Sequence, residues 1–337
     1  MQNFRPHPLL RGGHAQTLAG MCLSYPYRDY SAVQQLVSLD DGDRLVLHDD
    51  CPDDWRPGQR VAVLVHGLGG THNSPYVRRL AEKLNDLGTR TFRLDLRGCG
   101  VGEDHSRGGA HGASWPDLAA AVEHVAVLCP DSPTALVGYS LGGALALNLA
   151  GELGSGKCGN LTSVFAVCPP LDLLSLGRRF RGFPARIYDR HFCDMMWRHI
   201  TRRVESMANP PVIDLTRRPR TLRKLDEWVI APFHGYADVL EYYSHANAGP
   251  RLASINIPTR IVLAADDPVI PIEPLEHYPR SSHVEAFITP SGGHVGFVGR
   301  PGEDADTRWI DWRVAEWMMD QPEWAVGGVT NTLVAVG

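Results

Sequence analysis

The sequence lacks a CxxC pair, and its seven cysteines are odd in number. It therefore does not indicate a zinc finger or a redox pair, and we expect reduced thiols in a reducing compartment. The start of the chain also lacks the charged and apolar segments of a signal peptide. Together these absences predict a cytoplasmic protein. The cysteines are Cys22, Cys51, Cys99, Cys129, Cys158, Cys168 and Cys193.

The chain has no excess of positive charge, and we find no repeats or low-complexity tracts. Its net charge of −5 argues against a general nucleic-acid binder. A hydrophobic content of 43% and a charged content of 21% are typical of a soluble globular protein. No compact group of His, Cys and carboxylate residues has the spacing of metal ligands, so we expect no metal and no cofactor.

Charge is absent from residues 132–151, around the stretch "TALVGYSLGGALALNLA". About 20 apolar residues would cross a bilayer, but this run is broken by small and polar residues. Its first half resembles a buried strand, and its second half has leucines at helical spacing. A strand that ends where a helix begins predicts a very tight turn at Ser140. The interrupting residues are Gly138, Ser140, Gly142, Gly143 and Asn148.

Apolar strand patterns alternate with helical patterns through most of the chain. This alternation predicts an α/β fold with a mostly parallel sheet covered by helices on both faces. A DG turn between two apolar runs at residues 34–51 predicts an antiparallel hairpin ahead of it. The predicted strands lie within 60–67, 89–96, 134–140, 161–170, 259–266 and 284–290, and the predicted helices include 75–87, 115–128, 141–149 and 307–319.

One segment interrupts the alternation, with helical patterns and no convincing strand from residue 172 to residue 247. We therefore predict an α/β core of residues 1–171 and 248–337 and a helical cap of residues 172–247. Residues 178–224 carry a net charge of +9, which leaves −14 for the rest of the chain. The basic cap either attracts an anionic partner or is a solvated helical face. The arginines nearest the sheet are Arg178, Arg179, Arg181 and Arg186.

The residues around Ser140 fit the pattern G-x-S-x-G, the nucleophile elbow. At such an elbow the serine has a strained backbone and the strand and helix backbones approach closely, so the flanking positions need glycine. The predicted strand before it and helix after it supply the context that the motif requires. The alternative is that Ser140 only caps the helix.

A serine needs a base, and the base needs a carboxylate to orient it. In this architecture the chain order is serine, acid, histidine. "AADDPVIP" follows a late strand and offers Asp266 and Asp267, and "SGGHVGF" follows the next strand and offers His294. These positions meet at the carboxyl ends of parallel strands. We predict Asp267 as the acid, with Asp266 as the alternative.

An oxyanion requires two preorganised N–H donors. The backbone N–H of Leu141, just after the predicted nucleophile, is the first candidate. The second is the N–H of Leu68 in "LVHGLGG", a glycine-rich loop that follows an early strand. His66 is expected to position this loop rather than to react. "RGCGVG" also follows a strand, but it departs from G-x-G-x-x-G and is only a weak dinucleotide signal.

At these residues the chain resembles the α/β-hydrolase superfamily, and more narrowly its YheT-like and ABHD1–3-like branch. The resemblance implies a carboxylic-ester hydrolase with Ser140, Asp267 and His294 as its triad. Eukaryotic relatives act on acyl lipids and carry an N-terminal membrane anchor, which we do not expect here. The motifs are "LRGGHAQTL" (10–18), "HGLGG" (66–70), "LRGCG" (96–100), "GYSLGG" (138–143), "APFHGYADVLEYY" (231–243), "DDPVIP" (266–271) and "GGHVGF" (292–297).

The sequence therefore predicts a serine esterase or lipase that acts on a small-molecule or lipid acyl ester. The basic cap predicts transient contact with an anionic membrane surface. An amidase, a thioesterase or an acyltransferase would use the same residues, and a non-catalytic binding protein could share the fold. Nothing in the sequence indicates acyl length, the alcohol or an oligomeric state.

Overall fold

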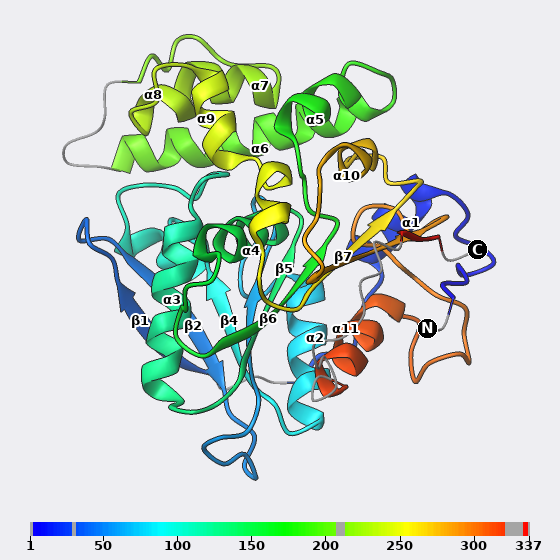
Figure 1. The fold of residues 1–337 in the computed structure, drawn as a ribbon. Helices are drawn as coiled ribbons and strands as arrows, with labels where there is room; N and C mark the ends of the chain where they lie inside the picture. Colours follow the sequence, from blue (N-terminus) through cyan, green and yellow to red (C-terminus); the bar gives the residue numbers. More distant parts are fainter. Residues whose placement is uncertain (1–2, 29–31, 207–212, 321–332, 336–337) are drawn as a thin grey trace.

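A nine-stranded sheet forms the centre of the protein (Figure 1). The computed structural model describes residues 3–28, 32–206, 213–320 and 333–335. The strand order is β1-β2-β4-β3-β5-β6-β7-β8-β9. The strands are β1 (Val33–Ser38), β2 (Arg44–Asp50), β3 (Val61–Val65), β4 (Arg90–Asp95), β5 (Thr134–Tyr139), β6 (Leu161–Val167), β7 (Thr259–Ala264), β8 (Val284–Thr289) and β9 (Leu333–Ala335).

Strand direction divides this sheet into two parts. β1 and β2 form the predicted antiparallel hairpin, and β2 also pairs antiparallel with β4. All the other neighbouring strands are parallel. The mostly parallel sheet is therefore confirmed, and its parallel strands present their carboxyl ends at one edge. The short β9 beside β8 is a strand that the sequence analysis does not predict.

Helices cover both faces of the sheet, as predicted. α2 (Pro75–Asp86) and α11 (Trp309–Met319) pack on one face, and α3 (Trp115–Leu128) and α4 (Leu141–Leu153) pack on the other. Each pair encloses a separate apolar layer against the strands. A buried ion pair joins the first two helices, since Arg79 Nε of α2 lies 2.8 Å from Asp311 Oδ2 of α11.

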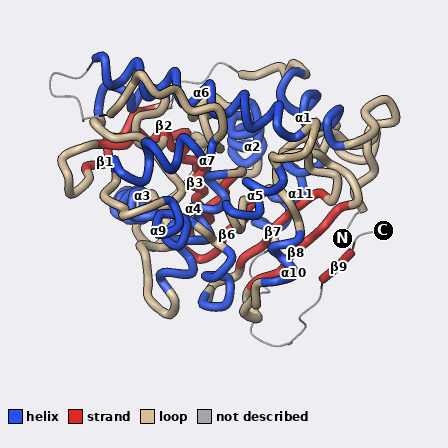
Figure 2. Tube along the Cα trace, turned by 90° about the horizontal axis from the view of Figure 1, so that it is seen from above, coloured by secondary structure: helices blue, strands red, loops and turns tan. Residues whose placement is uncertain are grey.

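The chain between β6 and β7 forms a group of helices above the carboxyl edge of the sheet (Figure 1). Seen from above, α5, α6 and α7 overlie the strands (Figure 2). No strand occurs in the described part of residues 172–247. We keep the name cap for these residues, and the division into core and cap remains our proposal. The helices are α5 (Leu173–Arg179), α6 (Ala185–Ser206), α7 (Leu222–Leu225), the π-helical turn η2 (Asp226–Ile230), α8 (Ala231–Phe233) and α9 (Val239–Ala246).

Shorter elements complete the fold around the same edge. α1 (Gly13–Cys22) precedes the sheet, η1 (Gly100–His105) follows β4, η3 (Gly249–Ser254) leads back to β7, and α10 (Glu273–His277) follows β7. Among the described helices, none is both long enough and apolar enough to cross a membrane. All seven cysteines are free thiols, in line with the sequence analysis.

Candidate active site

The turn between β5 and α4 has the strained geometry that the motif predicts. Ser140 has a φ of 51° and a ψ of −118°, a conformation that residues other than glycine rarely adopt. A methyl group on Gly138 would lie 2.2 Å from the carbonyl oxygen of Gly142, and one on Gly142 would lie 2.6 Å from that of His66. Both flanking glycines are therefore required by the close approach of the strand, the helix and the neighbouring loop.

The three residues predicted as a triad lie together at the carboxyl edge of the sheet. Ser140 Oγ lies 3.0 Å from His294 Nε2, and His294 Nδ1 lies 2.9 Å from Asp267 Oδ2. The Asp267 side chain is 1% exposed. Its other oxygen, Oδ1, accepts hydrogen bonds from the N–H groups of Val269 and Ile270. This arrangement fixes the carboxylate and directs it at the imidazole.

Asp266, the alternative acid, points elsewhere. Its Oδ1 accepts a hydrogen bond of 2.9 Å from the backbone N–H of Gly293. No hydrogen bond joins Asp266 to the imidazole of His294, whose Nδ1 is engaged with Asp267. Burial raises the pKa of the Asp266 carboxyl. Asp266 therefore holds the backbone of the histidine loop, and Asp267 is the acid that the geometry favours.

The loop after β3 brings Leu68 beside the nucleophile. Leu68, Leu141, Ser140 and His294 line the same cavity, and a methyl group on Gly67 would lie 3.1 Å from Ser140 Cβ. Leu141 is the first residue of α4, so its N–H has no acceptor within the helix. Both predicted oxyanion donors therefore belong to segments that border Ser140.

His66 holds the loop after β3 through two hydrogen bonds. Its Nε2 accepts a hydrogen bond of 3.2 Å from the N–H of Leu96, and its Nδ1 lies 2.8 Å from the carbonyl oxygen of Gly67. Only an imidazole with its proton on Nδ1 satisfies both contacts. Burial lowers the pKa of His66, which keeps it neutral. The expected positioning role agrees with this geometry.

Helix α1 supports the histidine loop, a role that the sequence analysis does not assign. The backbone N–H of His294 donates a hydrogen bond of 2.8 Å to Thr17 Oγ1. A methyl group on Gly13 would lie 1.8 Å from the carbonyl oxygen of Asp266, and one on Gly293 would lie 2.3 Å from that of Gly13. The motif "LRGGHAQTL" carries the signal, because its glycine and threonine are the residues that make this contact.

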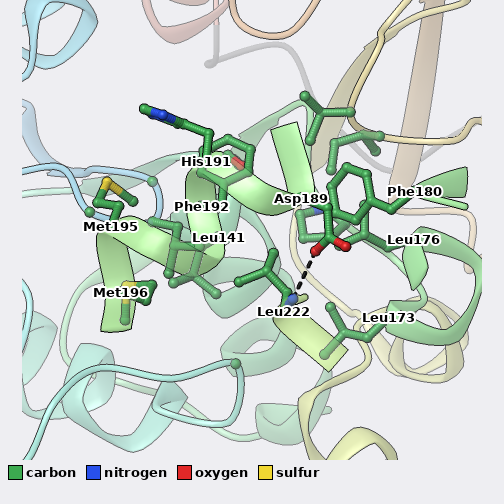
Figure 3. A pocket seen from close by; sticks show the side chains of 18 of the residues that line it. Leu141, Leu173, Leu176, Phe180, Asp189, His191, Phe192, Met195, Met196 and Leu222 are labelled. Carbon is green, nitrogen blue, oxygen red and sulfur yellow. Dashed lines mark hydrogen bonds between the residues drawn. The ribbon is translucent and has the colours of Figure 1, made fainter. Parts of the chain in front are cut away.

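Ser140 and His294 line a cavity of about 880 Å³ beneath the cap. Figure 3 shows several of the other side chains that line it. Leu141 of the core and several cap residues line it, including Leu173, Leu176, Phe180, Phe192, Met195, Met196 and Leu222. The wall is therefore mostly apolar, and the cap supplies most of it. Such a cavity suits an acyl chain or another apolar group attached to a reacting carbonyl.

The basic segment divides into residues that line this cavity and residues that do not. Arg181 and Arg186 are exposed and line the cavity. Arg178 instead donates to Ser175 Oγ, and Arg179 donates to the backbone carbonyl of Asp267. All four arginines belong to the predicted basic segment, but only Arg181 and Arg186 border the space where a substrate would lie.

The fold brings together two groups of possible metal-ligand side chains that have no ligand spacing along the chain. Potential ligand atoms of His48, His72 and Asp95 lie within 4.8 Å of one another, from β2, the loop after β3 and the end of β4. A second such group contains Cys168 with Asp267 and His294. Spacing along the chain could not reveal either group, because each is assembled from separate strands and loops.

The first of these groups has the geometry of a hydrogen-bond network. His48 Nε2 and His72 Nδ1 lie 3.0 and 2.8 Å from the same oxygen of Asp95. The two rings stack with centroids 3.4 Å apart, so their in-plane lone pairs do not converge on one ion. Burial alone would raise the pKa of Asp95, but the hydrogen bonds from both histidines lower it overall. Gly100 packs against this carboxylate, since a methyl group there would lie 2.4 Å from Oδ1.

A second histidine pair joins the cap to the core. The ring centroids of His111, before α3, and His234, after α8, are 3.8 Å apart. Burial lowers the pKa of His111 to about 3, with smaller contributions from the neighbouring His234 and Arg97. Burial and Arg97 lower that of His234 to about 4. Both imidazoles are therefore neutral in the folded protein near neutral pH.

This pair predicts a loss of stability in mild acid. An unfolded histidine takes up a proton below about pH 6.5, whereas these folded ones remain neutral until about pH 3–4, so stability falls as the pH drops through that window. The unfolding free energy of the original protein should therefore be lower at pH 5 than at pH 7. We expect this difference to be smaller by about 1–2 kcal/mol in each of the variants His111→Gln and His234→Gln. Urea unfolding at both pH values measures this, and an unchanged loss in both variants would contradict it.

Comparison with known proteins agrees with this fold. A model of the alpha/beta hydrolase family matches residues 62–306. The putative esterase YheT of Escherichia coli (strain K12) is 29% identical over 289 residues, which cover 84% of each chain. The phospholipase ABHD3 of Homo sapiens is 25% identical over 70% of this chain, but this chain spans only 58% of the human protein.

Solved structures show the same fold at lower identity. The ferulic acid complex of Est1E from Butyrivibrio proteoclasticus has a TM-score of 0.52 and 17% identity, with 86% of this chain and 99% of that chain covered. The 2,6-dihydroxy-pseudo-oxynicotine hydrolase has a TM-score of 0.58 and 16% identity over 91% of this chain and 71% of that chain. The chain therefore belongs to the alpha/beta hydrolase family, in the branch of YheT and ABHD3 that its motifs predict.

Proposed function

We propose that the protein is a serine carboxylic-ester hydrolase that works through an acyl-enzyme. The observation that carries this proposal is the continuous contact from Asp267 through His294 to Ser140, at distances of 2.9 and 3.0 Å. Asp267 has no proton to donate when ionised, so it holds a proton on Nδ1 of the imidazole. Nε2 is then free to accept the proton of the serine hydroxyl.

The first half of the proposed reaction transfers the acyl group to the enzyme. Ser140 Oγ attacks the ester carbonyl carbon while His294 Nε2 takes its proton. The N–H groups of Leu68 and Leu141 stabilise the negative oxygen of the tetrahedral intermediate. When the intermediate collapses, His294 gives its proton to the leaving alcohol, and the acyl group remains on Ser140.

The second half regenerates the enzyme with water. His294 removes a proton from a water molecule, whose oxygen attacks the acyl carbonyl. The same two N–H groups stabilise the second intermediate, and His294 returns a proton to Ser140 as the acid leaves. No cofactor takes part in these steps. The mostly apolar cavity and the esterase and lipase names of the relatives support an acyl ester, either a small molecule or a lipid.

A fluorophosphonate probe tests the proposed nucleophile directly. The probe phosphonylates a serine whose proton an adjacent base accepts, so we expect one stable adduct on Ser140. Mass spectrometry of a tryptic digest locates the adduct. Prior incubation with an acyl ester is expected to slow labelling, because the acyl-enzyme occupies the same oxygen. Labelling at another serine, or none, would contradict the proposal.

We further propose that the exposed arginines at the cavity favour anionic esters and transient contact with an anionic membrane surface. Arg181 and Arg186 both line the cavity, and the described residues give neither an ion-pair partner. Near an anionic surface a basic residue contributes about 1 kcal/mol, and salt screens this attraction. A phosphate next to the ester would therefore gain from both side chains.

Two esters with the same acyl chain test this preference. At low salt we expect a monoacylglycerol phosphate to have a higher kcat/KM than the corresponding monoacylglycerol, by roughly fivefold for each arginine. Arg181→Glu and Arg186→Glu should remove this advantage, as should high salt. Arg198→Glu is the control, because Arg198 is exposed on α6 away from the cavity. Equal rates for the two esters at low salt would show that Arg181 and Arg186 are simply solvated and do not bind the substrate.

A further inference from the structure

Two carboxyl groups interrupt the apolar wall that the cap contributes to the cavity. Asp189 lies on α6, and Asp226 begins the π-helical turn η2. Both line the cavity that also contains Ser140 and His294. Asp189 is only 6% exposed, and Figure 3 shows its carboxylate among the side chains of Leu176, Phe180 and Leu222. These acids thus face the space that a bound substrate would fill.

Each carboxyl group uses one oxygen to hold the cap together. Asp189 Oδ1 accepts a hydrogen bond of 2.7 Å from the N–H of Leu222, at the start of α7. Asp226 Oδ2 accepts a hydrogen bond of 2.9 Å from the hydroxyl of Tyr243 on α9. The described residues provide no hydrogen-bond partner for Asp189 Oδ2 or Asp226 Oδ1. The structural contacts therefore engage two of the four carboxyl oxygens of this pair.

The surroundings of the two aspartates make it unfavourable to leave Asp189 Oδ2 and Asp226 Oδ1 without a hydrogen-bond donor. No described Lys or Arg forms an ion pair with either aspartate, and burial raises the pKa of both. For Asp226 burial and the nearby Asp189 raise the pKa to about 7, against the effect of the Tyr243 hydroxyl. A carboxyl oxygen that is shielded from water and has no hydrogen-bond donor is unfavourable, and such groups concentrate where a ligand supplies the missing interaction.

We propose that Asp189 and Asp226 form a subsite that binds a hydrogen-bond donor, a hydroxyl or an ammonium group, on the part of the substrate beneath the cap. The inference rests on the proposed function, because the reacting ester at Ser140 fixes one end of the substrate. An unsubstituted alkyl end would leave both oxygens without a donor. A carboxylate at that end would be repelled by the two acids.

A matched series of methyl esters tests the subsite. The acyl chains run from about six to about twelve carbons and end in a methyl, hydroxyl, amino or carboxylate group. At one or two adjacent lengths we expect the hydroxyl or amino ester to exceed the methyl-ended ester roughly tenfold in kcat/KM. At those lengths the carboxylate-ended ester should be the slowest, because its charge would lie beside the two acids. Titration of the released acid at pH 7.5 gives the rates.

The variant Asp226→Asn changes the proposed subsite without changing Ser140, His294 or Asp267. Its amide oxygen can still accept from Tyr243, but the group facing the cavity becomes an N–H donor. We expect the ratio of kcat/KM for the hydroxyl- or amino-ended ester to that for the methyl-ended ester to fall to roughly twofold or less. Asp214→Asn is the control, because Asp214 is exposed in the cap and does not line the cavity.

Two results would overturn the subsite: no donor preference at any chain length, or a preference that survives in Asp226→Asn. If the protein hydrolyses none of the esters, the proposed function fails instead. Calorimetric binding of the same series to the Ser140→Ala protein then decides the subsite on its own, since it needs no turnover. Tighter binding of the donor-bearing ester supports the subsite, and equal binding excludes it.

Discussion

Ser140→Ala is expected to lower kcat for ester hydrolysis by about 10⁴-fold to 10⁶-fold. The change removes the oxygen that forms the acyl-enzyme, so His294 has no hydroxyl to deprotonate. What remains is the slower direct attack of water, assisted by the N–H groups of Leu68 and Leu141. Stopped assays with a p-nitrophenyl ester measure the loss over the whole range.

The fold should survive this change. The backbone N–H of Ser140 still donates to the carbonyl oxygen of Val167, and alanine has to adopt the same positive φ that serine already adopts. Circular dichroism and the Tm of the variant are the checks. Ser244→Ala, at an exposed serine of α9, is the matched control with full activity. Activity within tenfold of the original in pure, folded Ser140→Ala protein would exclude the proposed mechanism.

Asp267→Asn is expected to lower kcat by about 10⁴-fold. An amide group at this position donates toward His294 Nδ1, which places the imidazole proton on Nε2. Nε2 then cannot accept the proton of Ser140. The amide oxygen can still accept from the N–H groups of Val269 and Ile270, so the turn after β7 is retained.

Asp266→Asn is the matched comparison for this prediction. Asp266 contacts the N–H of Gly293 rather than the imidazole, and an amide oxygen can make that contact too. We therefore expect a loss of less than about tenfold, the cost of a slightly displaced histidine loop. The pH profile of kcat/KM distinguishes the two variants, because only Asp267→Asn alters the proton position on His294. A larger loss at Asp266 would exchange the two roles.

The sequence predicts the parts of the site that depend on local chain geometry. G-x-S-x-G specifies a turn within five residues, and Gly138 and Gly142 show why, since a methyl group on either would overlap backbone atoms. The order of serine, acid and histidine identified the two loops. The sequence favoured Asp267 over Asp266, and the geometry favours the same residue, because these adjacent side chains point in different directions.

Contacts between distant segments were beyond the sequence analysis. Thr17 and His294 are 277 positions apart, and nothing in their spacing indicates that one supports the other. The groups around Asp95 and around Asp226 are likewise assembled from separate elements. Counting charges identifies the basic segment but not the contacts of its residues. Arg178 and Arg179 form hydrogen bonds outside the cavity. Arg181 and Arg186 line the cavity.

The dependence of the histidine loop on α1 has a consequence for synthesis of the protein. The ribosome makes α1 early, but residues 292–297, on which it packs, come about 280 positions later. At about 5–20 residues per second, α1 waits roughly 15 to 55 seconds for its partner. Its buried face consists of Gly13, Gln16, Thr17, Ala19 and Gly20, which are too small or too polar to aggregate while they wait. A nascent chain therefore has no positioned His294, and the proposed ester hydrolysis can begin only after translation has passed this loop.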